Sequence, residues 1–360
     1  MYKFLDNSIV HSRLIIATSL LLGISIITLS SIAPNVLFNQ LIAIGLGICF
    51  IIFFRKFEWR PFFNYGYAVA LLYLIMILLL IATFYFAVPI RGIRAWLTIG
   101  GYQFQTSEFA KVVLILVFAY FLGERHLEIT RLSIIIKTFI LTALPIGLIL
   151  LQPDMGSAII LGGVWFCLLL LSGLRLKHIF IASFIFIIGA VFAWYQVLAP
   201  YQKNRIIALF NPELDQRGIN YNVTQSKIAI GSAGFLGKGY GQGTQVQLGF
   251  LPEAETDFIF AAIIEEWGLI SGIILLSIFV YLMFQIMKIG ILAESNLEKY
   301  ICLGTGVVIA AHFTINLGST LGLFPVVGVP LPFVSAGGSN IVAMMVLIGI
   351  INSIGVRTYN

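Results

Sequence analysis

The stretch that decides the fold runs from 256 to 287 and reads TDFIFAAIIEEWGLISGIILLSIFVYLMFQIM. From Phe258 onward it is apolar and long enough to cross a bilayer as a helix, which needs about 20 residues. Asp257 stands just before this helix, at the end of a long polar stretch. A carboxylate at the mouth of a membrane-spanning helix is a candidate functional residue, but an acid that only complements the helix dipole would occupy the same place. Position alone does not separate these two interpretations.

The composition extends the membrane pattern to the whole chain. Of its 360 residues, 60% are hydrophobic and 10% are charged, whereas soluble domains carry about 25% charged residues. We therefore expect an all-α polytopic membrane protein that forms a single domain over 1–360. Hydropathy windows of about 19 residues predict about ten transmembrane helices. Their ranges are 14–32, 36–54, 66–88, 107–123, 133–151, 155–172, 178–197, 258–287, 300–322 and 338–356.

Positive charge predicts the orientation of these helices. With a cytoplasmic N-terminus, most of the 21 Lys and Arg residues fall on inner segments, and the short outer joints 33–35, 152–154 and 323–337 contain none. Both termini are then cytoplasmic, and the loop 198–257 between helices 7 and 8 is extracytoplasmic. Because this loop contains apolar residues that can be buried, we expect a folded cap that lies over an extracytoplasmic active site.

The cysteines and histidines predict neither disulfide bonds nor a metal site. Cys49, Cys167 and Cys302 all lie in apolar runs and have no ligand spacing. The histidines do not cluster. His312, inside an apolar run, is expected to be a helix-packing residue whose hydrogen bonds are satisfied.

Three ionisable residues lie near the ends of predicted helices. Glu108 and Lys111 are three residues apart, on one face of the fourth helix. Ionisable residues at membrane depth usually face an interior cavity and pair, so we expect this pair to form the wall of a polar cavity. A structural ion pair between helices is the alternative. Asp154 is placed to cap the sixth helix, with orientation of cavity residues as a second role.

The long outer loop combines glycines with basic residues. The glycines between 231 and 243 allow positive φ and close approach of a ligand to the backbone. Together with Arg205, Lys227 and Lys238, they form a candidate set for binding phosphate oxygens. The pattern matches no Walker or dinucleotide fingerprint, so it is a weak signal by itself.

The segment 316–339 is too rich in Pro and Gly for a continuous helix. Irregular backbone at membrane depth is tolerated only where it is buried in protein or lines a cavity. We therefore expect a re-entrant or interfacial loop that shapes the same cavity as Asp257, with Ser335 among the cavity residues. On a continuous helix, Glu265 would lie about 80° around the axis from Asp257 and Glu266 roughly opposite it, so both cannot line the same face.

Taken together, these runs resemble the SEDS family (shape, elongation, division and sporulation), and within it the RodA branch. Three positions depart from the family pattern: Thr106 replaces a proline, Ala336 an aromatic residue, and Trp267 a Leu or Phe. The matching runs are FQ at 104–105, SE at 107–108, AK at 110–111, QPD at 152–154, QSKIAIGS at 225–232, GKG at 237–239, GTQ at 243–245, FLPE at 250–253, TDFIF at 256–260, PLPF at 330–333, Ser335 and GGS at 337–339.

The resemblance implies a peptidoglycan glycosyltransferase that polymerises lipid II at the outer face of the bacterial cytoplasmic membrane, for cell elongation and rod shape. It implies that Asp257 is the catalytic residue. We assign Asp257 as the general base, because the attacking sugar hydroxyl must lose a proton. The leaving pyrophosphate requires positive charge, and a divalent cation, Mg²⁺ or Mn²⁺, is a further candidate. The residues that match as candidates for this charge are Lys111, Arg205, Lys227 and Lys238.

The implied partners are a class B penicillin-binding protein, which acts as a transpeptidase, and other membrane proteins of the elongation complex. Nucleic acid is not expected. Three alternatives stay open: a polymerase of the division or sporulation branch, a flippase or transporter of lipid-linked precursors, and a non-catalytic scaffold. Broken helices also suit a transporter. Because the charged motifs gather on the outer side, the sequence favours an enzyme that opens outward.

Overall fold

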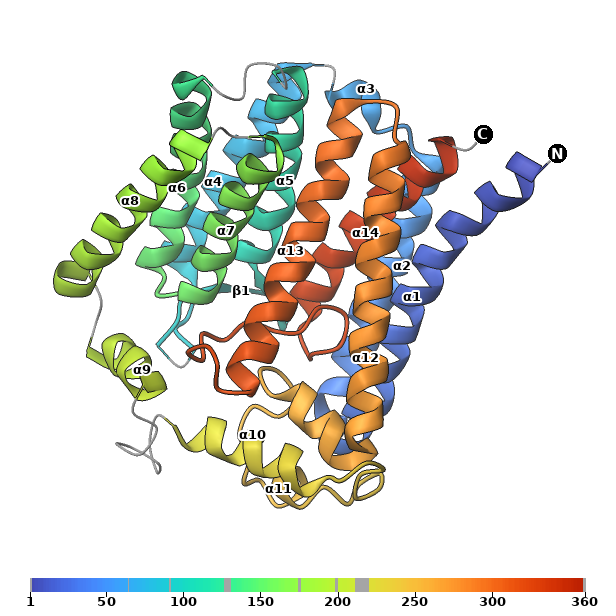
Figure 1. The fold of residues 1–360 in the computed structure, drawn as a ribbon, viewed down its shortest axis with the longest axis vertical. Coiled ribbons are helices and arrows are strands. Elements are labelled where there is room, and N and C mark those ends of the chain that lie inside the picture. The colour runs from blue at the N-terminus through green and yellow to red at the C-terminus, as the bar shows by residue number, and fades with distance from the viewer. Residues whose placement is uncertain are drawn as a thin grey trace.

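The structure is a computed structural model that describes residues 2–63, 65–90, 92–125, 131–173, 176–197, 200–210 and 220–358. In these ranges the chain forms a bundle of long helices with short elements at both ends (Figure 1). The long helices are α1 (Tyr2–Ile32), α2 (Pro34–Lys56), α4 (Gly66–Phe86), α5 (Thr106–Glu124), α6 (Leu132–Leu151), α7 (Met155–Leu171), α8 (Leu176–Phe192), α12 (Ile259–Leu292), α13 (Asn296–Thr320) and α14 (Gly338–Thr358).

Short elements connect the long helices. We use the name cap for the described part of the loop between α8 and α12, residues 200–210 and 220–257; its helices α10 and α11 lie beneath one end of the bundle (Figure 1). The short elements are α3 (Arg60–Phe63), β1 (Trp96–Ile99), β2 (Tyr102–Gln105), the π-helical turn η1 (Ala193–Val197), α9 (Pro200–Phe210), α10 (Tyr221–Ser232) and α11 (Thr244–Gln247).

The predicted all-α polytopic membrane fold is confirmed. Each predicted transmembrane range coincides with a long helix. In the described residues, 8 helices are long and apolar enough to cross a membrane, and the apolar helix α7 is shorter. The ends differ from the prediction where helices continue past the apolar window. The first helix begins at Tyr2 instead of residue 14, and α12 continues to Leu292.

Two helices form the centre of the bundle. In α5 and α14, 78% of the most apolar window is buried in the protein, compared with 22% in α2 and α4. Central helices have protein neighbours on all sides, and only there can polar side chains find partners away from water. This is the physical reason why α5 and α14 contain the buried polar residues described below.

The eighth predicted span is not continuous, because α12 is broken at Gly268. This residue has φ 84° and ψ 174°, outside the helical range. Segment 234–239 crosses the break and satisfies the backbone groups that the helix loses. The amides of Leu269 and Ile270 donate to the carbonyls of Gly234 and Phe235, at 3.1 and 3.4 Å. A Cβ on Gly268 would lie 2.1 Å from the Phe235 oxygen, so only glycine fits.

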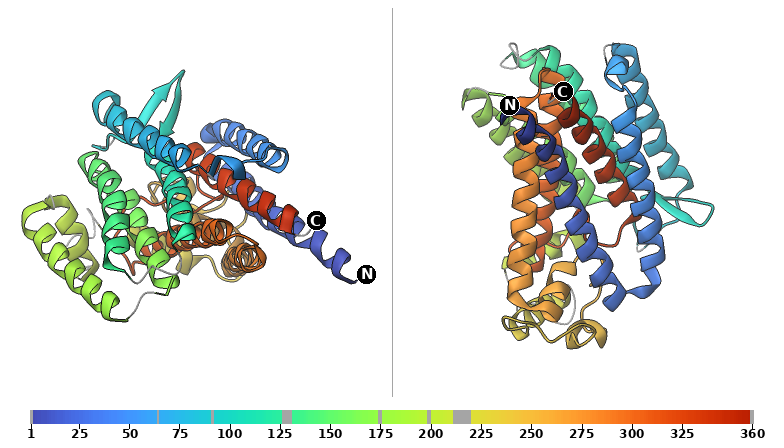
Figure 2. Two further views of the ribbon diagram at one scale, coloured as in Figure 1. Left: turned by 90° about the horizontal axis from the view of Figure 1, so that it is seen from above. Right: turned by 90° about the vertical axis from the view of Figure 1, so that its right-hand side faces the viewer.

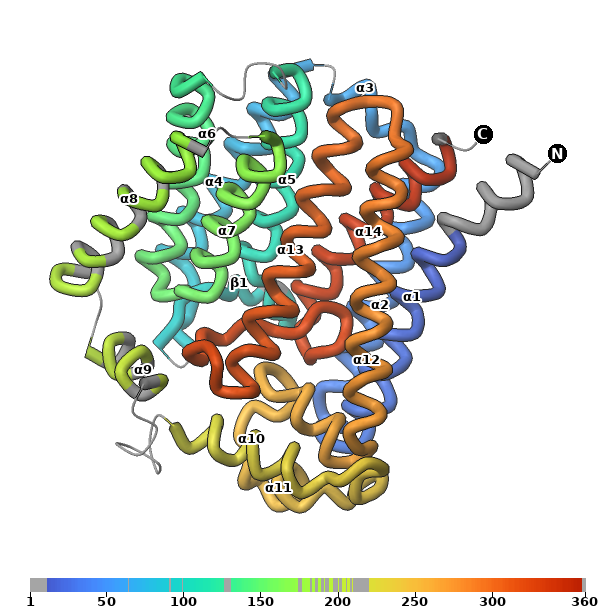
Figure 3. Tube along the Cα trace, viewed as in Figure 1, coloured from blue at the N-terminus to red at the C-terminus, as the bar shows by residue number. Residues whose placement is uncertain are grey.

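Residues 321–337, between α13 and α14, form an irregular segment, as their Pro and Gly content predicts. Figure 3 shows this segment folding back beside the ends of α12 and α13. Its residues Leu331, Phe333 and Val334 are fully buried. The segment therefore meets the condition for irregular backbone at membrane depth, which is burial within protein.

The joint between α4 and α5 forms a small hairpin that was not predicted. Strands β1 and β2 are antiparallel, with Trp96 paired to Gln105. The turn residues Gly100 and Gly101 both have positive φ, as a two-residue hairpin turn requires. Figure 2 shows the hairpin projecting from the side of the bundle. Its base is anchored to α14, because the Gln105 amide donates to Ser339 Oγ at 2.9 Å.

Candidate active site

Asp257 lies in a tight turn before α12 rather than in the helix itself. The amides of Asp257 and Phe258 both donate to the carbonyl of Glu253, each at 3.1 Å. The helix begins at Ile259, and Phe258 is its N-cap residue. Because Asp257 precedes the N-cap, the angular relation predicted for a continuous helix does not apply.

The main chain of Asp257 is held by α13. Its carbonyl accepts hydrogen bonds from Asn316 Nδ2 at 2.9 Å and from Thr320 Oγ1 at 3.4 Å. Its carboxylate faces the irregular segment, since Oδ2 lies 3.9 Å from the position that a Cβ on Gly328 would occupy. The residue is half-buried. Asp257 is thus fixed through its main chain while its side chain remains partly accessible.

Ser335 joins the irregular segment to the residues before Asp257. Its hydroxyl accepts from the Leu331 amide at 2.9 Å and donates to the Thr256 carbonyl at 2.5 Å. The next amide, that of Ala336, donates to the Glu255 carbonyl at 2.8 Å. Ser335 is 2% exposed. Ser335 is therefore buried and bonded to the residue that precedes Asp257.

Glu108 and Lys111 form a buried ion pair in the middle of the bundle, with 2.7 Å between Lys111 Nζ and Glu108 Oε1. Each side chain is only 2% exposed. Asn340 Nδ2 donates to Glu108 Oε2 at 2.9 Å, and Lys111 Nζ lies 2.9 Å from His312 Nε2. The predicted pairing is confirmed. Its enclosure matches the alternative interpretation, an ion pair that joins helices, here α5, α13 and α14.

Asp154 caps α7, as its position in the sequence predicts. Its Oδ1 accepts from the Ser157 amide at 3.0 Å. Its Oδ2 accepts from Ser107 Oγ at 3.1 Å and from Gln105 Nε2 at 3.2 Å. Asp154 therefore also fixes the first turn of α5, directly before Glu108.

The three predicted phosphate-binding cations have different surroundings. Lys238 is paired with Glu265 at 2.7 Å and donates to Thr244 Oγ1 at 2.7 Å. Lys227 is exposed and lies across Gly322. The prediction for Arg205 falls on a side chain outside the described residues. Of the two described cations, Lys227 has the more accessible charge.

Lys227 also lies close to the segment that holds Asp257. The preceding residue, Ser226, donates through Oγ to the carbonyl of Thr320 at 2.6 Å. The Thr320 hydroxyl is one of the two groups bonded to the Asp257 carbonyl. Helix α10 is thereby fixed against the end of α13, with Lys227 on its exposed face.

The sequence predicts that at least one of the two glutamates before the break in α12 contacts another helix, and Glu266 does so through Ser31 of α1, but their attachment to the cap was missed. Glu265 accepts from the amides of Gln245 and Val246, at 2.8 and 3.2 Å, besides its contact with Lys238. Glu266 accepts from Ser31 Oγ at 2.6 Å and from the Gly241 amide at 3.2 Å. Two buried carboxylates thus bind the turns of the cap. The signal in the sequence was two adjacent carboxylates inside an apolar run, two residues before a glycine.

A metal site does not emerge from the described side chains. Among them, no group of three or more His, Cys, Asp or Glu residues is arranged to hold an ion. Mg²⁺ is often bound by one or two carboxylates together with substrate phosphates. A divalent cation would depend on the substrate for most of its ligands, with Asp257 as one described carboxylate beside the irregular segment.

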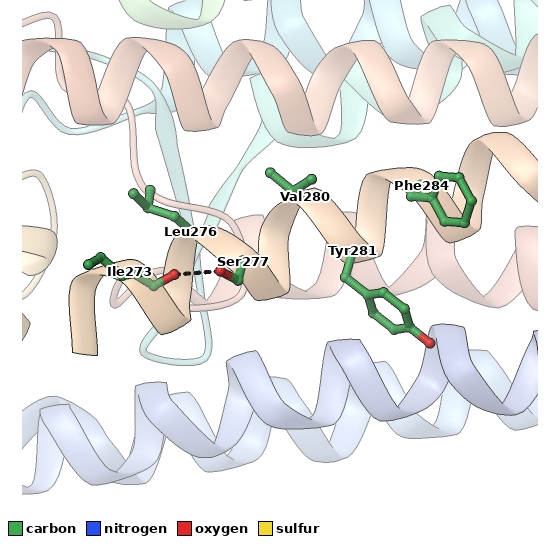
Figure 4. Close-up of a pocket in the computed structure, with 6 residues that line it drawn as sticks. All are labelled: Ile273, Leu276, Ser277, Val280, Tyr281 and Phe284. Atoms are coloured by element: carbon green, nitrogen blue, oxygen red, sulfur yellow. Dashed lines mark hydrogen bonds between the residues drawn. The ribbon is translucent and has the colours of Figure 1, made fainter. Parts of the chain in front are cut away.

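A shallow hollow of about 460 Å³ lies on the outer side of α12 and is separate from Asp257 (Figure 4). Ser277 Oγ donates to the Ile273 carbonyl within the helix, at 2.8 Å. The lining contains no charged side chain, so the hollow lacks the chemistry expected of a glycosyl-transfer site. It is lined by Ile273, Leu276, Ser277, Val280, Tyr281 and Phe284.

The fold and the site define an α-helical polytopic membrane protein with a carboxylate fixed between its cap and its helix bundle. Comparison with known proteins gives the family. The sequence model of the FtsW/RodA/SpoVE family, described as cell cycle protein, matches residues 8–360. The chain therefore belongs to the FtsW/RodA/SpoVE family, which confirms the resemblance to SEDS proteins.

Relatives with assigned names include members of three branches. The chain is 36% identical over 305 residues to the peptidoglycan glycosyltransferase MrdB of Escherichia coli, covering 83% of this chain and 79% of that protein. It is 36% identical over 300 residues to the probable peptidoglycan glycosyltransferase FtsW of Trichlorobacter lovleyi, covering 80% and 75%. It is 31% identical over 326 residues to stage V sporulation protein E of Bacillus subtilis, covering 87% and 82%.

Solved structures share the whole fold. A chain from a structure described as "Structural coordination of polymerization and crosslinking by a peptidoglycan synthase complex" superposes with a TM-score of 0.80 at 26% identity, covering 95% of this chain and 96% of that chain. The rod shape determining protein RodA of Thermus thermophilus gives a TM-score of 0.71 at 26% identity, covering 96% and 97%.

Proposed function

We propose that Asp257 is the general base of glycosyl transfer in this chain. The chain is a peptidoglycan glycosyltransferase of the elongation type, as its membership of the family and its similarity to MrdB and RodA indicate. The substrate we propose is lipid II, a disaccharide-peptide linked to a polyprenyl pyrophosphate. The observation that supports the role of Asp257 is its fixed main chain combined with a partly accessible carboxylate.

In the proposed reaction, the sugar 4-hydroxyl of one substrate attacks the anomeric carbon of another. A new C–O bond forms, the bond between the anomeric carbon and the pyrophosphate oxygen breaks, and the hydroxyl proton passes to the carboxylate of Asp257. A positioned general base contributes about 10²–10⁴-fold to such a step. The turn 253–258 and the donors on α13 hold the base in position before substrate binds.

The departing pyrophosphate gains negative charge and requires a cation nearby. We assign Lys227 this role, because it is exposed and its helix is fixed against the segment that holds Asp257. Arg205, on α9, remains a second candidate. Lys238 is better assigned to the cap, since it pairs with Glu265. Lys111 is better assigned to the bundle centre, since it is buried with Glu108.

The break in α12 bears on the transporter alternative. In transporters, groups freed at broken helices bind substrate or coupling ions. In this chain the groups beside Gly268 bond to cap residues instead, and the amides of Lys238 and Gly239 donate to the carbonyls of Glu265 and Glu266 at 2.9 Å each. The break therefore supports a fixed cap over an enzyme site more than alternating access.

We also propose that the site faces the extracytoplasmic side and that both termini are cytoplasmic. Helix α1 begins and α14 ends at the end of the bundle away from α10 and α11 (Figure 1). This agrees with the orientation predicted from the Lys and Arg residues. By analogy with the synthase complex, the proposed partner is a class B penicillin-binding protein.

The test is polymerisation of lipid II by the purified protein, with and without its cognate penicillin-binding protein. We expect glycan polymer from wild type and a rate at least about 100-fold lower from Asp257→Asn. The control is Glu294→Gln, which removes an exposed carboxylate after the end of α12. Equal polymer from wild type and Asp257→Asn would remove Asp257 as the base. If wild type makes no polymer even with its partner, the activity is wrong and lipid scrambling is the next assay.

A further inference from the structure

One face of α13 carries three polar side chains in successive turns. His312, Asn316 and Thr320 are spaced by four residues, so they lie above one another along the helix. All three are fully buried. Asn316 and Thr320 both donate to the carbonyl of Asp257, and Asn316 Nδ2 also donates to the Val329 carbonyl at 2.9 Å. This row therefore contacts both the irregular segment and the turn that contains Asp257.

His312 connects this row to the buried ion pair. Its Nε2 lies 2.9 Å from Lys111 Nζ, and its Nδ1 lies 3.0 Å from the Pro330 carbonyl oxygen. An ammonium group only donates hydrogen bonds, and a carbonyl only accepts them. The two contacts are satisfied together when Nε2 accepts and Nδ1 carries the hydrogen. The imidazole is then neutral and joins a fixed cation to a backbone oxygen.

Several bonds hold the segment that receives this bond. Pro330 and Pro332 have no amide hydrogen, so neither can donate a backbone bond. On the side of α13 the segment is held by His312 and Asn316. On its other side it is held by Gln40 of α2 and by the bond from the Ala336 amide to the Glu255 carbonyl. Because Ser335 also donates to the Thr256 carbonyl, a shift of residues 329–335 would reach the neighbour of Asp257 directly.

We propose that His312 is a positioning residue for glycosyl transfer, which fixes the Pro330 carbonyl relative to the Glu108–Lys111 pair and so holds residues 328–336 against Asp257. The proposal rests on the proposed function of Asp257. It explains why an ion pair buried in the bundle centre is connected to the site: the pair serves as an anchor for the segment that faces the carboxylate. His312 itself takes no part in proton transfer to or from substrate.

Two substitutions distinguish the effect of the hydrogen bonds of His312 from the effect of its ring. His312→Gln keeps an acceptor for Lys111 and a donor for Pro330 on one amide group. His312→Leu fills similar space and keeps neither. We expect His312→Leu to lower kcat for lipid II polymerisation by about 10–100-fold with little change in KM, because small misplacement of catalytic groups reduces the chemical step. We expect His312→Gln to retain most of the wild-type kcat.

The matched control is Thr305→Val on the same helix. Thr305 is fully buried and donates only within α13, to the Ile301 carbonyl at 2.8 Å. It should leave kcat unchanged. Equal losses in His312→Leu and His312→Gln would overturn the proposal, as would wild-type kcat in His312→Leu.

Hydrogen exchange gives a readout that does not depend on activity. His312→Leu should raise exchange in a peptide covering 328–336 and leave a peptide covering 238–247, held by Glu265 and Glu266, as in wild type. Unchanged exchange in 328–336 would overturn the proposal even if activity fell. If wild type fails to polymerise lipid II, the proposed function is wrong, while the exchange experiment still decides whether His312 positions this segment.

Discussion

At the scale of single residues, the Glu108–Lys111 pair shows what the sequence could and could not predict. Their spacing of three on one helix predicted the contact, because such residues share a face. The same sequence gave no sign of His312 as a partner, since it lies 201 residues from Lys111 along the chain. The bond from His312 to Pro330 depends on the path of an irregular segment, which hydropathy does not describe.

Removing one charge of this pair should be costly. Lys111→Met leaves the Glu108 carboxylate buried with Asn340 as its remaining described partner. Loss of one member of a buried ion pair costs about 3–5 kcal/mol. We expect a clearly lower Tm in detergent for Lys111→Met and for Glu108→Gln tested singly.

The double variant Glu108→Gln/Lys111→Met provides the control, because it removes both charges. Replacing a whole buried pair by neutral side chains is often tolerated, so its Tm should lie above that of Lys111→Met. If the decrease in Tm of the double variant equalled the sum of the decreases of the two single variants, the two charges would not interact.

At the scale of elements, α12 shows why a correctly placed helix can still have the wrong shape. Hydropathy predicted the range of α12 to within a few residues. It did not predict the break, because one glycine hardly changes the mean of a 19-residue window. The break at Gly268 requires segment 234–239 to supply hydrogen bonds and space. That partnership is a tertiary contact, and the sequence of α12 alone does not contain it.

Gly268→Ala should therefore destabilise the protein much more than an ordinary glycine substitution. The new Cβ would lie 2.1 Å from the Phe235 oxygen, at a backbone φ of 84°. Backbone strain of this kind costs about 1–3 kcal/mol, and the clash adds to it. The expected result is a lower Tm and faster proteolysis of the cap.

The comparison for this experiment is Gly231→Ala in α10. No atom lies within 4 Å of the Cβ that this substitution adds. Alanine in a helix is favoured over glycine by about 0.5–1 kcal/mol, so Tm should stay equal or rise slightly. Similar losses from both substitutions would contradict the structural account of the break.

At the scale of the whole molecule, the distribution of apolar and basic residues was sufficient to predict the positions of the long helices and of the termini. Apolar windows located the long helices, and the Lys and Arg residues gave a consistent arrangement of both termini at one end. The hairpin β1–β2 was missed because its strands are four residues each and lie in a polar joint. The cap was predicted to be folded, but its attachment through Glu265 and Glu266 was not.

The orientation can be tested by labelling cysteines with a membrane-impermeant maleimide. Leu236→Cys replaces a residue of the cap that is 80% exposed, and it should react from outside in intact cells. Lys56→Cys, at the exposed C-terminal end of α2, should react only after the membrane is opened. The wild type, with its three native cysteines, measures background. The reverse pattern would place Asp257 on the cytoplasmic side.

The break at Gly268 also determines what moves when the bilayer changes thickness. A continuous span answers hydrophobic mismatch by tilting, and the tilt moves whatever is attached to its end. In α12, segment 234–239 bonds to the carbonyls of Glu265 and Glu266 before the break and to the amides of Leu269 and Ile270 after it. Both parts of the helix are therefore tied to one segment of the cap. A tilt of α12 would carry the cap and the turn of Asp257 along as one body, so the site would keep its internal geometry while its depth in the bilayer changed.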